Sequence, residues 1–273
     1  MSRADTTGRL AVVLVRSPRF RRALPLLLAG ALLAAACSGE RPEIAESGST
    51  TTTAADTTTS TTVPEPTGAE VAQAIDPTID VFASEDATTP ERQIVSGVDT
   101  TVETIPIVFL VKSTGLERHE VYLPVRPNGS HGWVNASEVT LTRVPYRIEV
   151  GISEHRLRVF SDEEIIVDEP IGVGRQDRPT PGGVYYLKEL LQPPSPNGPY
   201  GTYAYGLSGF STVLTSFNGG TGVIGIHGTN EPEKIGQSVS AGCVRLRNED
   251  IDALVDAIED PYDSYGIRVE ILS

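Results

Sequence analysis

Cysteine is rare in this chain, whose 273 residues include only Cys37 and Cys243. The first has a separate role, described below, so Cys243 has no obvious disulfide partner, and a lone thiol of this kind is a candidate reactive group. Long apolar runs are missing too: the uncharged segment 23–36 has 14 residues, whereas a membrane-spanning helix needs about 20. This short run therefore excludes a membrane span at this position.

Positive charge is also scarce. The chain has 22 Lys and Arg residues against 36 Asp and Glu residues, and six of the arginines lie within residues 1–36. From residue 37 onward, 16 basic and 35 acidic side chains give a net charge near −19. Such an acidic surface favours solubility and disfavours nucleic acid as a partner, but it does not identify a substrate.

The N-terminus has the pattern of an export signal. Four arginines between residues 16 and 22 precede the apolar segment, as in a secretory signal peptide. Three alanines then precede Cys37 and resemble a bacterial lipobox, although its usual leucine is Ala34 here. We predict a signal peptide over 1–36 and a lipid on Cys37 that anchors the protein outside the cell membrane, facing the cell wall. Cleavage without lipidation is the alternative.

Composition divides the rest of the chain into a linker and two folded modules. Nine threonines among residues 50–62, with few apolar side chains nearby, predict a disordered linker over 37–76. Short segments of strand-forming residues, separated by turns, follow over 77–144. Together with a Gly-Trp-Val segment at 132–134, they resemble bacterial SH3-like barrels. We therefore predict a small SH3-like β module in this part of the chain.

Two histidines of this module, His119 and His131, lie in polar, turn-rich surroundings. We predict both as solvated loop residues. Since neither is accompanied by a cluster of cysteines or carboxylates, no metal site is predicted there.

Residues 145–273 include several short segments with the pattern of strands. Tyr146–Gly151 and Arg156–Phe160 are the clearest, and Val223–His227 is a further candidate. One helix is expected over 248–258, with Asn248 as its N-cap and acidic residues in its first turn. The fold is predicted as mainly β: a small SH3-like β-barrel followed by a β-rich domain with one main helix.

Cys243 lies in the run Ser240–Leu246, 16 positions after His227. A thiol and an imidazole in one loop region can form a thiolate–imidazolium pair, which attacks carbonyl groups at neutral pH. The alternative is a buried thiol that acts as a small apolar residue, a common state of free cysteine. The glycine and arginine near Cys243 favour the reactive interpretation.

These two segments resemble the signature of the L,D-transpeptidase family (YkuD-type catalytic domain). The signature is a His-Gly turn, here His227-Gly228, followed by Ser-His-Gly-Cys-Val-Arg, here Ser240-Ala241-Gly242-Cys243-Val244-Arg245. The resemblance covers residues 145–273, and the family's second histidine is Ala241 here. It implies that His227 is the general base and that the Gly228 carbonyl orients the imidazole.

The same resemblance implies roles for the residues around the nucleophile. The backbone N–H groups of Gly242 and Cys243 are expected to form an oxyanion hole. Arg245 is expected to bind a carboxylate of a peptidoglycan stem peptide. The alternative for Arg245 is an ion pair with Glu249 or Asp250.

A segment rich in proline, glycine and tyrosine, 192–215, resembles the lid that covers the cleft in this family. Within it, Tyr203 or Tyr205 is expected to line the substrate pocket. A packing role for these tyrosines is the alternative.

The resemblance also implies a reaction on peptidoglycan. Cys243 would attack the amide between the third residue of a stem tetrapeptide and its terminal D-alanine, and the side-chain amine of a second stem would then attack the thioester. No metal or organic cofactor is implied, and carbapenem-type inhibitors are expected to acylate Cys243. Two alternatives stay open: a hydrolase of the L,D-carboxypeptidase type with the same nucleophile, and a non-catalytic lipoprotein that binds the cell wall.

Overall fold

A computed structural model describes residues 68–97, 105–216, 220–258 and 264–273. These residues all belong to one compact unit. The predicted signal peptide, Cys37 and the linker up to residue 67 lie outside the described residues. Among the described residues, no helix is long and apolar enough to cross a bilayer.

Antiparallel strands form the N-terminal module. Its five-stranded sheet has the order β6-β5-β4-β1-β7, and β2 and β3 form a separate pair. The elements are β1 (Ala69–Ala74), β2 (Thr78–Val81), β3 (Arg92–Val95), β4 (Val108–Ser113), β5 (Arg118–Tyr122), β6 (His131–Asn135), the 3-10 helix η1 (Ala136–Glu138) and β7 (Val139–Val144). Phe109, Val121 and Val134 are buried together in its core. The SH3-like assignment itself stays a prediction.

The folded part of the chain begins earlier than the sequence suggested. Residues 69–74 fall within the predicted linker 37–76, but they form β1, which pairs with both β4 and β7. Three of the six residues of β1 are alanines, which are uncommon in strands, so this segment lacks the usual strand composition. The C-terminal boundary of the predicted linker was therefore wrong.

The two histidines of this module differ from each other. His119 was predicted as a solvated loop residue, but it is buried on the inward face of β5, where its Nδ1 accepts a hydrogen bond from Gly115 N (3.3 Å). His131 is exposed as expected, although it lies on β6, with its Nδ1 2.9 Å from the Glu120 carboxylate. The alternation of the strand, not the polarity of the segment, decides which histidine is buried.

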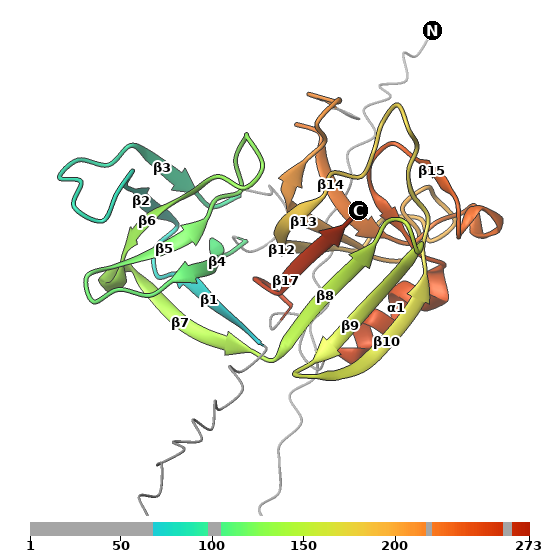
Figure 1. Ribbon diagram of the computed structural model, residues 1–273, viewed down its shortest axis with the longest axis horizontal. Coiled ribbons are helices and arrows are strands. Elements are labelled where there is room, and N and C mark those ends of the chain that lie inside the picture. Colours follow the sequence, from blue (N-terminus) through green and yellow to red (C-terminus); the bar gives the residue numbers. More distant parts are fainter. Residues whose placement is uncertain (1–67, 98–104, 217–219, 259–263) are drawn as a thin grey trace, which may run out of the picture. The chain divides into compact units, whose positions relative to one another are not determined.

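An eight-stranded mixed sheet forms the second module (Figure 1). Its order is β10-β9-β8-β17-β12-β13-β14-β16, in which β17–β8 and β14–β16 are the parallel pairs. The strands are β8 (Tyr146–Gly151), β9 (Arg156–Ser161), β10 (Glu164–Pro170), β12 (Gly183–Leu191), β13 (Ala204–Phe210), β14 (Val223–His227), β16 (Val244–Arg245) and β17 (Arg268–Leu272). Two short strands, β11 (Val173–Gly174) and β15 (Ser238–Ser240), form a separate parallel pair, and η2 (Pro232–Lys234) is a 3-10 helix. The prediction of a mainly β fold is confirmed.

The one α-helix among the described residues, α1 (Asn248–Ala257), lies against β10 (Figure 1). Ile251, Leu254 and Val255 are buried and bring the apolar face of the helix into the sheet's core. The N-cap is Arg247, not Asn248 as predicted. Asn248 is already the first helical residue, and its side chain has other partners, described below.

Strand β13 was not expected, because the predicted lid 192–215 includes it. Two glycines within this strand, Gly206 and Gly209, weakened its strand pattern. A Cβ atom on Gly209 would lie 2.3 Å from a ring carbon of Tyr185, and one on Gly206 would lie 2.5 Å from the Glu189 carboxylate. These positions need glycine because neighbouring side chains pack directly on the backbone. The lid prediction was wrong over 204–210.

Candidate active site

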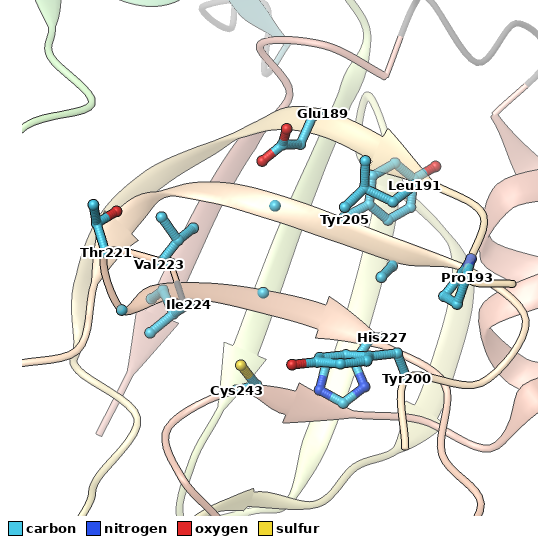
Figure 2. Close-up of a pocket in the computed structure, with 15 residues that line it drawn as sticks. Glu189, Leu191, Pro193, Tyr200, Tyr205, Thr221, Val223, Ile224, His227 and Cys243 are labelled. Atoms are coloured by element: carbon cyan, nitrogen blue, oxygen red, sulfur yellow. The ribbon is translucent and has the colours of Figure 1, made fainter. Parts of the chain in front are cut away.

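The parallel pairing of β14 with β16 brings the predicted nucleophile and base together. His227 is the last residue of β14, and Cys243 immediately precedes β16. The register pairs Ile226 with Val244, so His227, which follows Ile226, and Cys243, which precedes Val244, lie close together on adjacent strands. Figure 2 shows the sulfur and the imidazole at the same side of one cavity, which both residues line.

A hydrogen bond orients the imidazole. His227 Nδ1 lies 2.6 Å from the Gly228 carbonyl oxygen, so Nδ1–H donates to that oxygen and Nε2 carries the free lone pair. This is the contact that the orienting role of Gly228 requires. The ring of Tyr200 packs edge-to-face on His227, with ring centroids 5.0 Å apart. Tyr200 also lines the cavity, although the sequence did not single it out.

Burial favours the neutral forms of both groups. It lowers the pKa of His227 to about 4, against the opposing effect of the Gly228 hydrogen bond and with a further contribution from the positive charge of Arg245. Burial also raises the pKa of the Cys243 thiol, although Gly225 and Arg245 oppose this shift. Both shifts favour a neutral thiol beside a neutral imidazole in the free protein, because desolvation disfavours both charges. The thiolate–imidazolium pair stays a prediction.

A hydroxyl group braces the turn that carries the nucleophile. Ser240 is buried, and its Oγ donates to Cys243 O (2.6 Å) while it accepts from Gly242 N (3.0 Å). Gly242 has φ +122°, a conformation that other residues rarely adopt. Its N–H is bonded to Ser240 Oγ, so Gly242 is not a free donor here, and the predicted oxyanion hole stays a prediction with the Cys243 N–H as its remaining candidate donor. A serine two places before a glycine in a turn was the available signal for this role.

Arg245 has a partner that neither prediction named. Its Nη1 lies 3.0 Å from Glu231 Oε2, and Arg245 is not among the residues that line the cavity. Asp250 instead pairs with Arg247, at 3.4 Å. In this structure Arg245 therefore acts on the site through its charge, which disfavours protonation of His227.

Of the two tyrosines predicted to line the pocket, the structure places only Tyr205 at the cavity. Tyr205 lines the cavity from β13, but only 1% of its surface is exposed, so it forms a wall. Tyr203 packs against the hydrophobic core and does not line the cavity. Its carbonyl oxygen accepts a hydrogen bond from Gly228 N (3.1 Å), which holds the turn after His227.

Asn248 joins that turn to two other segments. Its Oδ1 accepts from Thr229 N (3.1 Å), and its Nδ2 donates to Pro196 O (2.9 Å). A Cβ on Gly201 would lie 2.1 Å from Asn248 Oδ1, and one on Gly228 would lie 2.4 Å from it. The two glycines thus make room for the amide that fastens the His227 turn to the start of α1.

The cavity has a volume of about 320 Å³. Its lining comes mainly from strands β12, β13 and β14. Residues between these strands, together with Cys243, complete it. The lining residues are Glu189, Leu191, Pro193, Tyr200, Ala204, Tyr205, Gly206, Gly220, Thr221, Gly222, Val223, Ile224, Gly225, His227 and Cys243. Most of these residues are apolar or glycine. No group of three or more His, Cys, Asp or Glu side chains that could hold a metal occurs within the described ranges.

The arrangement is a cysteine–histidine site at one end of a mixed β-sheet. Residues 145–271 match the family model of the L,D-transpeptidase catalytic domain, YkuD. This segment is therefore similar to the catalytic domains of that family.

Relatives in other bacteria agree with this assignment. The candidate L,D-transpeptidase YkuD of Bacillus licheniformis is 34% identical over 128 residues, 47% of this chain and 66% of the relative. YkuD of Bacillus subtilis is 33% identical over the same shares. ErfK/SrfK of Escherichia coli is 31% identical over 56% of this chain and 52% of its own length. The chain thus spans just under two thirds of the first two relatives and about half of the third.

Solved structures give a weaker likeness. L,D-transpeptidase 3 of Mycobacterium tuberculosis, in complex with a faropenem-derived adduct, is 16% identical, with 57% of this chain and 92% of that chain covered and a TM-score of 0.39. The family assignment rests on the sequence matches and not on this likeness.

Proposed function

We propose that the protein is a peptidoglycan L,D-transpeptidase that links the third residues of two stem peptides through a thioester on Cys243. The observation that supports this proposal most directly is the shared cavity, in which the bond between His227 Nδ1 and the Gly228 carbonyl leaves Nε2 free to accept the thiol proton. The family match of residues 145–271 gives the class of reaction.

In the first half-reaction, Cys243 Sγ attacks the carbonyl carbon of the third residue in the donor tetrapeptide. The thiol proton passes to His227 Nε2 during the attack, because neither group is ionised beforehand. The Cys243 N–H donates to the developing oxyanion. As the C–N bond breaks, His227 returns the proton to the departing amine of D-alanine, and the third residue stays on Cys243 as a thioester.

In the second half-reaction, the side-chain amine of an acceptor stem attacks the thioester carbonyl. His227 accepts a proton from the attacking nitrogen and passes it to the departing sulfur, which restores the neutral thiol. A new amide bond replaces the amide bond to D-alanine, so the exchange needs no cofactor or added source of energy.

The proposal extends to location and inhibition. A lipid on Cys37 would hold the enzyme at the outer face of the membrane, and the threonine-rich linker would let it reach the cell wall. Carbapenems would acylate Cys243, because a β-lactam presents the thiol with an amide carbonyl that ring strain makes more reactive than a peptide bond.

The test uses residues 38–273, without the predicted signal peptide, and a disaccharide tetrapeptide as both donor and acceptor. Mass spectrometry should detect a cross-linked dimer that has lost one D-alanine, and Cys243→Ala should abolish it. Hydrolysed monomer without dimer would favour the L,D-carboxypeptidase alternative. If neither product forms and no β-lactam adduct appears on Cys243, the non-catalytic wall-binding alternative replaces the proposal.

A further inference from the structure

Four residues form a row across the catalytic sheet. The register pairs Glu189 on β12 with Gly206 on β13, and Gly206 with Gly225 on β14. Because Ile226 pairs with Val244 in the parallel β14–β16 pair, the preceding Gly225 lies opposite Cys243. All four residues line the same cavity. The row thus has a thiol at one end, a carboxylate at the other and two glycines between them.

The two ends of this row are far enough apart to contact different parts of one substrate. Neighbouring strands are about 4.8 Å apart, so the backbones of Cys243 and Glu189 lie about 14 Å from each other. Figure 2 shows the two side chains on opposite sides of the cavity. Since the intervening glycines have no side chains, a linear group can lie directly across the strands.

The fold aims the Glu189 carboxylate along this row. A register shift between Leu187 and Glu189 interrupts the pairing with β13, an irregularity that redirects a side chain. The side chain of Glu189 reaches over Gly206, where a Cβ would lie only 2.5 Å from Oε1. Any larger residue at 206 would displace the carboxylate.

Glu189 also lacks a close positive partner within the cavity. Its ion pair with Lys188 is long, with 3.8 Å between Nζ and Oε1, and the cavity lining includes no lysine or arginine. His227 is neutral at physiological pH, because burial lowers its pKa to about 4. The carboxylate is therefore the one formal charge among the described residues that line this cavity.

We propose that Glu189 binds a protonated primary amine at the end of a long substrate side chain, on the residue whose carbonyl Cys243 attacks. This inference rests on the proposed function. Six bonds separate such a carbonyl carbon from the amine nitrogen of a lysine or a related diamino acid, roughly 7 Å when extended. A charged hydrogen bond of about 2.8 Å then reaches a carboxylate above Gly206, two strand spacings, or about 10 Å, from Cys243.

Donor and acceptor stems both carry such an amine, and two kinetic arms test its assignment to the donor. In the donor arm, single-turnover acylation of Cys243 is measured with tetrapeptides whose third-residue amine is free or acetylated. The wild-type protein should prefer the free amine about tenfold, mainly through a lower half-saturating substrate concentration, and Glu189→Gln should remove this preference. In the acceptor arm, a preformed thioester is reacted with a free amine acceptor, and Glu189→Gln should leave this step unchanged. A slower acceptor step with an unchanged donor preference would overturn the assignment of the amine to the donor.

Two controls separate this inference from the proposed function. Acylation by a β-lactam without a basic group should be the same in wild type and Glu189→Gln, which also shows that the variant folds. Glu164→Gln, which removes an exposed carboxylate on the edge strand β10, should change neither arm. If both arms proceed and Glu189→Gln alters neither, the inference is overturned while the proposed function stands. Failure of every acylation in the wild type would instead reject the function.

Discussion

At the scale of single residues, the site depends on a pair that is neutral at rest. His227 is 4% exposed, and its Nδ1–H is held by the Gly228 carbonyl. Burial, helped by the charge of Arg245, lowers its pKa to about 4 and raises that of Cys243. Under the proposed function, we therefore expect proton transfer to accompany the attack on the substrate, because burial disfavours a preformed thiolate.

The rate of Cys243 acylation should follow the protonation of His227. The imidazole must be neutral to accept the thiol proton, so the rate should stay nearly constant from about pH 7.5 to about pH 5.5 and fall toward pH 4. Stopped-flow measurements with an uncharged β-lactam test this. A midpoint near the ordinary histidine pKa of about 6.5 would instead contradict the lowered pKa of His227. His227→Ala should lose the neutral-pH rate.

The folding stability should report the same lowered pKa of His227. Between about pH 6.5 and pH 4 the unfolded chain protonates this histidine and the folded protein does not, so folding stability falls as the pH falls through this range. Relative to His227→Gln, the wild-type protein should lose up to about 3 kcal/mol of unfolding free energy between pH 7 and pH 4. Urea unfolding at a series of pH values measures this difference. A constant difference would contradict the lowered pKa.

At the scale of elements, glycine inside β13 is a packing requirement. The ring of Tyr185 is buried and lies where a Cβ on Gly209 would be, at 2.3 Å. The same strand separates β12 from β14 and so sets the width of the cavity.

Gly209→Ala should destabilise the protein by about 1–3 kcal/mol, because neither the buried ring nor the central strand can move without disturbing the core. Gly172→Ala is a matched control, since its Cβ would meet its nearest neighbour at an ordinary 3.5 Å, and it should change stability by less than about 0.5 kcal/mol. Thermal or urea unfolding of the two variants gives the comparison. Equal stability of the two variants would show that β13 or the Tyr185 ring shifts at little cost to make room for the methyl group.

Asn248 offers a second test at this scale. Its side chain fastens Thr229 and Pro196, while Arg247 occupies the N-cap position of α1. Asn248→Ala should lower the acylation rate several-fold by loosening the turn after His227, with little change in the helical circular dichroism signal. Asn248→Asp keeps the acceptor for Thr229 N and should retain more of the rate. If Asn248→Ala instead reduces the helical signal and leaves the acylation rate unchanged, Asn248 acts as a helix cap and does not hold the His227 turn.

At the scale of the whole molecule, the N-terminal module contacts a wall of the active-site cavity. The Arg126 guanidinium donates to the carbonyl oxygens of Ser211 (2.7 Å), Leu214 (3.0 Å) and Thr221 (3.0 Å). Thr221 lines the cavity. Nearby, the Asn128 side chain forms two hydrogen bonds with the backbone of one residue at the end of β13.

The two modules also share apolar packing. Val71 and Leu110 of the N-terminal sheet belong to the same buried cluster as Ile148 and Tyr186 of the catalytic sheet. These contacts show that the N-terminal module packs directly against the catalytic module.

Arg126→Ala should therefore slow acylation of Cys243 several-fold and raise KM, because three carbonyls lose the donor that holds the segment ending at Thr221. Arg126→Lys should also slow acylation, but less than Arg126→Ala, since an ammonium group cannot reach all three carbonyls in the same geometry. Arg143→Ala, at an exposed position on β7, serves as the control. Single-turnover kinetics with an uncharged β-lactam provide the measurement, and unchanged rates in Arg126→Ala would limit the module to a passive role.

Local patterns in the sequence were sufficient to predict much of the catalytic domain. The strands at 146–151 and 223–227 have the predicted bounds, because alternation and turn residues report on each strand without reference to its neighbours. The Cys243 and His227 segments were recognisable because this chemistry requires particular residue types at a particular spacing. Strand β13 was missed because its glycines are required by side chains of another strand that pack on them, and local patterns do not report on such contacts.

By itself, therefore, the sequence determined the class of fold and the resemblance of the catalytic domain to its family, and it predicted a nucleophile and a base. The tertiary structure alone decided the burial of His227, the Glu231 partner of Arg245, the contacts of Asn248 and the row that joins Cys243 to Glu189. Each of these depends on which strands and loops become neighbours and on how much water they exclude. Residue types along one chain do not specify such long-range proximity and desolvation.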